Sequence, residues 1–175
     1  MKKVLLVLIT LITFVFLITL SSQEFTYVGP NKCKVCHRAE KLGKQFIIWE
    51  ESKHSKSFKA LTSEKAQEVA KAAGMGTKPT ENPECLKCHS PLFKKASNIT
   101  KEGVTCEFCH GPGSSYKKLS IMENREEAVK NGLIIHDSSE AIKKLCLTCH
   151  KDSQEKSFDF KISWEKIKHP VPGKK

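Results

Sequence analysis

The spacing of apolar and polar residues predicts a chain of short helices joined by loops. No segment alternates apolar and polar side chains convincingly enough to be a half-buried strand. Helices are expected at residues 61–73, 121–130 and 163–169, and in a segment that starts near Asp137 and runs toward the last pair of cysteines. The expected fold class is mainly α, with little or no sheet.

Particular residues mark where these helices begin and end, and where loops intervene. Ser, Thr and Asp accept hydrogen bonds at helix starts, whereas Gly and Pro end helices. The predicted markers are Thr62 or Ser63 with Gly74 for the first helix, Asn131-Gly132 for the end of the second, Asp137 and Glu140 as a capping box for the third, and Pro170 after the fourth. Gly111-Pro112-Gly113 predicts a turn, and residues 77–84, with two prolines, predict a loop.

The N-terminal segment has the layout of a bacterial secretory signal. Lys2 and Lys3 precede residues 4–20, an unbroken run of apolar residues and Thr. The run is long enough to cross a bilayer, and Ser21-Ser22-Gln23 is a poor cleavage site, so a retained anchor is the alternative. We expect residues 1–22 to be a signal peptide or membrane anchor. Residues 23–175 would then form one domain in the periplasm or on the outer face of the cytoplasmic membrane.

All eight cysteines belong to one motif, C-x-x-C-H, that occurs four times. Two thiols at this spacing can form thioethers with the two vinyl groups of a haem, and the adjacent imidazole can bind the iron as the proximal ligand. The sequence therefore predicts four covalently bound haems of the c type. The predicted thioether cysteines and proximal histidines are Cys33, Cys36 and His37; Cys85, Cys88 and His89; Cys106, Cys109 and His110; and Cys146, Cys149 and His150.

Three other uses of paired cysteines explain the pattern less well. A thioredoxin-like pair would occur once and would not need an adjacent His. Four identical close spacings make an odd framework for disulfides. Zinc is the strongest competitor, because 17 residues separate the second and third pairs, as in a four-cysteine zinc site. The His that follows every pair decides for haem, because four such placements by chance are very improbable.

The remainder of the chain is basic and poor in core-forming residues. The formal net charge is +11, or +9 once Lys2 and Lys3 are set aside. A basic balance can indicate nucleic acid or an anionic membrane, but the eight propionates of four haems would largely offset it. We expect no nucleic acid partner. About 38 residues per haem are too few to insulate each cofactor, so the haems are expected to lie close together and to supply much of the interior.

Three histidines lie outside the motifs: His54, His136 and His169. Each follows or ends a segment with apolar residues that could press an imidazole onto an iron, so all three are predicted distal ligands. Three candidates for four irons predict one haem with an open sixth position. Met75 and Met122 are possible substitutes, although gap-filling or surface roles suit both better.

The sequence resembles the cytochrome c-554 family of tetrahaem cytochromes. The resemblance covers nearly the whole chain after the N-terminal segment. It rests on the opening segment Tyr27-Val28-Gly29-Pro30-Asn31-Lys32-Cys33, the W-x-x-S-x-H element at Trp49, Ser52 and His54, the segment Gly103-Val104-Thr105-Cys106-Glu107, the trailing Gly111-Pro112-Gly113, and His169-Pro170.

The resemblance implies a helical fold with stacked pairs of haems and distal ligands that come from other parts of the chain. By order along the sequence, it implies the pairs His136 with His37, His54 with His110, and His169 with His150. The haem on His89 would be five-coordinate. His136 lies 26 positions after His110, farther than the resemblance implies.

Together these features predict an electron carrier that serves redox partner proteins, with residues 4–20 as a possible membrane tether. The alternative is an enzyme that reduces nitric oxide or nitrite at the open haem. Pro91, Leu92 and Phe93 follow the second motif and offer no obvious proton donor. The carrier is therefore the favoured interpretation.

Overall fold

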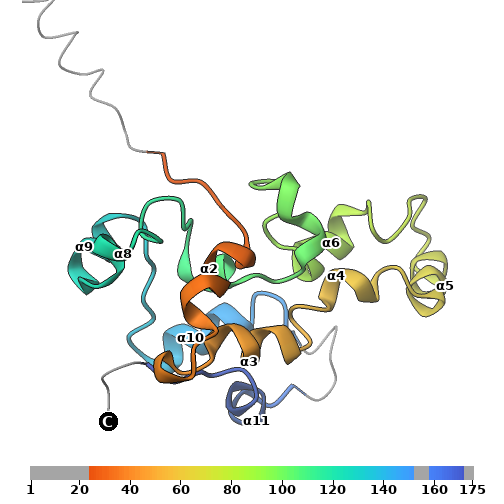
Figure 1. The fold of residues 1–175 in the computed structure, drawn as a ribbon. Coiled ribbons are helices and arrows are strands. Elements are labelled where there is room, and N and C mark those ends of the chain that lie inside the picture. The colour runs from red at the N-terminus through yellow and green to blue at the C-terminus, as the bar shows by residue number, and fades with distance from the viewer. Residues whose placement is uncertain (1–23, 152–157, 172–175) are drawn as a thin grey trace, which may run out of the picture.

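A computed structural model describes residues 24–151 and 158–171, and this part of the chain contains helices and no strand, as the sequence predicted. The N-terminal run at 4–20 lies outside it. Figure 1 shows the arrangement of the helices. They are α2 (Pro30–His37), η1 (Glu40–Leu42), α3 (Gln45–Glu51), α4 (Ser57–Ala60), α5 (Glu64–Ala72), α6 (Pro83–His89), η2 (Ser97–Glu102), α7 (Cys106–His110), α8 (Leu119–Met122), α9 (Arg125–Lys130), α10 (Ser139–Cys146) and α11 (Phe160–Glu165).

The C-x-x-C-H motifs lie on short helices. The first three occupy α2, α6 and α7, and the fourth begins at the last residue of α10. The fourth motif continues as a tight turn, in which the His150 amide donates to the Cys146 carbonyl at 2.9 Å. A helical turn brings two cysteines three positions apart onto one side. Proline starts both α2 and α6, where its missing N–H costs nothing.

The predicted helix around residues 61–73 is confirmed with a later start. The Ser63 hydroxyl accepts a hydrogen bond from the Ala66 amide, so α5 begins at Glu64, and Gly74 follows its end with φ +67°. Residues before Ser63 form a separate turn of helix, α4. The turn predicted at Gly111-Pro112-Gly113 begins at its last residue, Gly113, and Gly111 ends α7 with φ +78°. The predicted loop at 77–84 ends two residues early, because Pro83 starts α6.

The other three predicted helices differ from the structure because side chains cap them at other positions. Residues 121–130 divide into α8 and α9, since the Asn124 side chain accepts from two backbone amides and starts a new helix. Ser138, and not Asp137, caps α10. Asp159 caps α11, which ends at Glu165, so His169 lies in the extended segment that follows.

The polypeptide core is small. Leu92, Ala96 and Ile99 form a buried cluster, with Tyr27 and Phe108 packed against it. Several large apolar side chains remain exposed, among them Val35 at 82%. The chain thus buries few large apolar side chains of its own.

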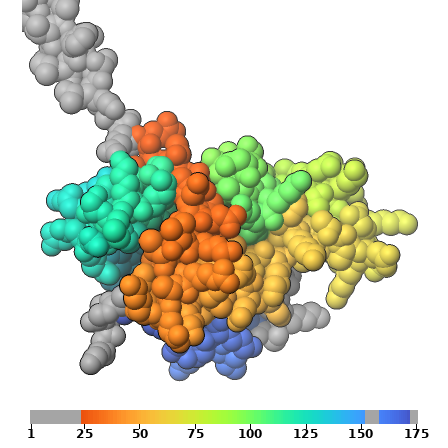
Figure 2. Space-filling model, in the orientation of Figure 1, coloured from red at the N-terminus to blue at the C-terminus, as the bar shows by residue number. Residues whose placement is uncertain are grey.

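The helices are spread around a central region. Figure 1 shows α2 and α3 across the middle, α5 at one end, α8 and α9 at the other, and α11 beneath α3. In the space-filling view of Figure 2, the segment that leads into α2 lies between the region of α8 and α9 and that of α6. Within the described residues, we find no helix with the length and apolar content to cross a bilayer.

Candidate haem-binding centre

The cysteine motifs meet in pairs, although they are far apart along the chain. Helix α2 packs against α7, and the thiols of Cys33 and Cys106 lie close to each other. The thiols of Cys88 and Cys149 make a similar contact, and the Cys149 sulfur lies 3.9 Å from the Lys87 carbonyl oxygen. The first motif therefore adjoins the third, and the second adjoins the fourth.

A further approach links the two pairs of motifs. Burial, followed by the nearby Cys146 and Cys149, raises the pKa of the Cys109 thiol to about 11. The third motif is thus a neighbour of the fourth as well as of the first. Every one of the eight cysteines is free to react, since none forms a disulfide.

His54 faces His150, the last residue of the fourth motif. Their ring centres are 6.1 Å apart, with an angle of 55° between the ring planes. Burial, followed by the neighbouring His150, lowers the pKa of His54 and keeps its imidazole neutral. Phe158 stacks on the His150 ring, at 4.4 Å between ring centres. A neutral imidazole is the form that binds iron.

His169 faces His110, the last residue of the third motif. The ring centres are 5.8 Å apart, with an interplanar angle of 43°. Burial, followed by the nearby His169, lowers the pKa of His110 to about 4. The Nδ1 atom of His169 is buried and has no hydrogen-bond partner among the described residues. The Gln45 amide donates to the Pro170 carbonyl at 3.1 Å and so fixes the segment that carries His169.

Both histidine pairs fit an iron held between two imidazoles. Two ring nitrogens, each about 2 Å from one metal ion, leave the ring centres roughly 6 Å apart. The observed separations of 6.1 and 5.8 Å match this value. Each pair also combines one C-x-x-C-H histidine with one histidine from outside the motifs. The residues present therefore fit the group that the motifs imply.

The pairing differs from the one that order along the sequence implied. The structure places His54 beside His150, not beside His110, and His169 beside His110, not beside His150. The physical reason is the folding of two segments. The Val104 amide donates to the His54 carbonyl at 3.1 Å, and this contact ties His54 to the backbone before α7 but leaves its ring directed at the fourth motif.

The W-x-x-S-x-H element has a structural role at each of its named positions. The Trp49 indole donates to the Val104 carbonyl at 2.8 Å. The Ser52 hydroxyl donates to the Trp49 carbonyl at 2.7 Å and accepts from the His54 amide at 3.2 Å. The element therefore fixes α3 against the third motif and sets the backbone of His54.

His89, in the second motif, is oriented by a backbone carbonyl. Its Nδ1 lies 2.8 Å from the Ser57 carbonyl oxygen, which requires the proton on Nδ1 and leaves Nε2 as the nitrogen for a metal. The Ser57 hydroxyl lies 2.8 Å from both the His89 and the His54 carbonyl oxygens and is shared between them. It strengthens the contact between Ser57 and His89. Nothing in the sequence marked Ser57 for this role.

His136 has a different environment from the other two spare histidines. Its Nε2 lies 2.8 Å from the Cys109 carbonyl oxygen, so this nitrogen is protonated and Nδ1 is left for a metal. His136 and His37 both contribute to lowering the pKa of His110, so all three rings lie in one neighbourhood. Ligation of the first haem by His136 stays a prediction.

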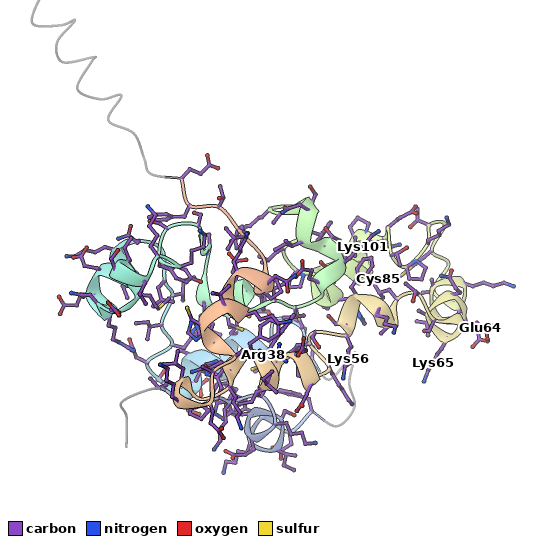
Figure 3. The ribbon with its side chains drawn as sticks, viewed as in Figure 1. Arg38, Lys56, Glu64, Lys65, Cys85 and Lys101 are labelled. Carbon is purple, nitrogen blue, oxygen red and sulfur yellow. The ribbon has the colours of Figure 1, made fainter. Side chains whose placement is uncertain are left out.

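The two methionines that the sequence singled out lie in different regions. The Met75 sulfur lies 3.9 Å from the Cys85 sulfur, at the edge of the second motif. Met122 is the last residue of α8. Figure 3 marks Cys85, and it shows Glu64 and Lys65 on the outlying helix α5.

Glu107 is the functional candidate that the sequence did not reveal as such. It stands between the cysteines of the third motif, yet only 1% of its surface is exposed. Glutamate is usually a surface residue, so composition gave no reason to expect it inside. The specific Gly-Val-x-Cys-Glu segment was the one available signal.

A helical chain with repeated C-x-x-C-H motifs and facing histidines defines the class of c-type cytochromes. The family model described as cytochrome c554 and c-prime matches residues 32–111. Cytochrome c-554 of Nitrosomonas europaea is 25% identical over 149 residues, which cover 74% of this chain and 59% of that protein. These findings confirm the resemblance to the cytochrome c-554 family and imply covalently bound c-type haem. No solved structure matches this chain.

Proposed function

We propose that this protein is a periplasmic electron-transfer protein with four covalent c-type haems. The observation that carries the proposal is the two pairs of facing histidines, with ring centres 6.1 and 5.8 Å apart, in which the C-x-x-C-H histidines His150 and His110 each meet a histidine from a distant segment. Bound haem would supply an iron that cycles between ferric and ferrous states. The matched segment covers less than two thirds of the relative's length.

The chain itself would do three things for electron transfer. Its cysteines would hold each haem at a fixed edge, and its neutral, partly buried histidines would bind the iron without a proton to displace. The contacts between motifs, Cys33 with Cys106 and Cys88 with Cys149, would keep neighbouring cofactors close. Close cofactors are what an electron path through a small protein requires.

Three irons would have two histidine ligands and one would be five-coordinate. The proposed bis-histidine sets are His150 with His54, His110 with His169, and His37 with His136. His89 would then bind an iron whose sixth position has no histidine. The periplasmic location is supported by the lysine-led apolar N-terminal run, because thioether attachment to haem takes place outside the cytoplasm.

Mass spectrometry and spectroscopy test this proposal. The protein is produced with a functional cytochrome-maturation system, and its intact mass should exceed that of the processed polypeptide by four haems. Low-temperature EPR of the oxidised protein should show three low-spin signals and one high-spin signal. Four low-spin signals would exclude the open site, and colourless protein that contains zinc would overturn the proposal itself.

A further inference from the structure

The Glu107 side chain is bound entirely by backbone amides. Its Oε1 accepts hydrogen bonds from Val28 at 2.9 Å and Gly113 at 2.7 Å, and its Oε2 accepts from Gly29 at 2.7 Å and Val28 at 3.1 Å. Both oxygens thus face N–H donors on two sides. Hydrogen bonds from N–H donors to both oxygens favour the ionised form of a carboxylate, which accepts and does not donate.

No cation balances this charge within the part of the chain that the structure describes. The ion pairs found there join exposed side chains on other segments, and none includes Glu107. The neighbouring Tyr116 is uncharged, and burial comes first among the causes that raise its pKa well above its usual range. A buried charge without a counter-ion acts strongly on its surroundings, because little water screens it.

The position of Glu107 ties the first motif to the third. Glu107 lies between Cys106 and Cys109 on α7, and Gly29, which it binds, is the N-cap of α2. Helix α2 carries Cys33, whose thiol contacts that of Cys106. The carboxylate therefore lies where the attachment sites of two haems adjoin.

We propose that Glu107 sets the reduction potentials of the first and third haems by holding a permanent negative charge beside them. The proposal rests on the four-haem function proposed above. Oxidation adds a positive charge to a haem, so a nearby desolvated carboxylate stabilises the ferric form and lowers the potential. Glu107 is a positioning residue as well, since it joins α2 to α7.

The direct test is Glu107→Gln, which removes the charge and keeps the size. Haem attachment is checked first by intact mass, so that failure of the proposed function is recognised separately. At a fixed solution potential, the ferrous-to-ferric ratio of the first and third haems should rise about tenfold, which corresponds to 59 mV for one electron. The second and fourth haems should shift much less. Glu126→Gln, on the exposed face of α9, is the matched control and should leave all four haems unchanged.

A second variant separates the effect of the Glu107 charge from its role in joining α2 to α7. A Cβ at Gly113 would lie 3.0 Å from the Glu107 Oε1 atom, so Gly113→Ala loosens the same contact but keeps the carboxylate. The potentials of the first and third haems should then stay at or below those of the unmodified protein. If both variants raise these potentials equally, a loosened haem site is the cause and the proposal is wrong.

The unmodified protein supplies a test that does not depend on any variant. Haem methyl signals are assigned by NMR through their contacts with motif residues, and each haem is titrated with reductant. The first and third haems should be the last of the bis-histidine haems to become reduced. If they are reduced first, Glu107 does not control their potentials.

Discussion

Gly103 lies at the contact between the His54 segment and the third motif, and its replacement by alanine should be severely destabilising. Its backbone has φ +74° and ψ −140°, a conformation that is accessible to glycine. A Cβ there would lie 2.6 Å from both the His54 carbonyl oxygen and the Ser57 hydroxyl oxygen. Neither atom can move freely, because the His54 carbonyl oxygen accepts hydrogen bonds from both the Val104 amide and the Ser57 hydroxyl.

The magnitude follows from two contributions. Backbone strain for a non-glycine residue in this region costs about 1–3 kcal/mol. Separation of the two segments would weaken two hydrogen bonds, at about 1 kcal/mol each. Gly103→Ala should therefore lower the free energy of unfolding by about 3–5 kcal/mol. For a chain of this size that corresponds to a fall in Tm of roughly 6–20 °C.

Two other glycines provide controls for the separate contributions. Gly74 also has a positive φ, +67°, but a Cβ there would meet nothing within 4 Å, so Gly74→Ala should cost only about 1–2 kcal/mol for the backbone. Gly76 has neither a positive φ nor a close neighbour, and Gly76→Ala should be neutral or stabilising by up to about 1 kcal/mol. Thermal unfolding of the holoproteins, followed by circular dichroism, gives the order. A Gly103→Ala protein within about 1 kcal/mol of Gly74→Ala would refute the close contact.

Three further predictions concern single side chains. Tyr116→Phe removes a buried hydroxyl that donates to a backbone carbonyl at 2.9 Å, and it should lower the free energy of unfolding by about 1–2 kcal/mol; no change in urea unfolding would contradict this. His54→Gly should convert the low-spin EPR signal of the haem on His150 to high-spin, and added imidazole should restore the low-spin signal. A change at the haem on His110 instead would support the pairing implied by order along the sequence. The pKa of His110, lowered to about 4 mainly by burial, gives the sign of a pH effect. Above pH 6.5 the ring is neutral in both the folded and the unfolded chain, and below pH 6.5 the unfolded chain gains a proton that the folded chain excludes. The free energy of unfolding in urea should therefore fall from pH 7 to pH 5. A flat profile would count against a buried neutral ring.

The sequence was sufficient for features that depend on neighbouring residues. The four motifs could be recognised because a C-x-x-C-H unit needs one helical turn and no contact with distant residues. The cap of α5 was predicted as Thr62 or Ser63 for the same reason, and Ser63 is the one that the structure shows. The break at Asn124 was missed, because a cap inside an otherwise helical pattern competes with the pattern itself.

Features that depend on tertiary packing could not be read in the same way. All three spare histidines were candidates from the sequence, but their order along the chain could not show that His54 meets His150 and His169 meets His110. Those pairings follow from hydrogen bonds between distant segments, such as Trp49 with Val104. The burial of Glu107 likewise depends on amides 78 and 79 positions away along the chain.

The facing histidines have a consequence for assembly. His54 and His150 are 96 positions apart, and His110 and His169 are 59 apart. With iron between them, each pair would close a long loop, much as a covalent cross-link does, and so would reduce the entropy of the unfolded chain. Neither loop can close until the segments that carry His150 and His169 have folded into place. A haem attached early to the third motif would therefore keep an incompletely ligated iron until the segment with His169 packs against it.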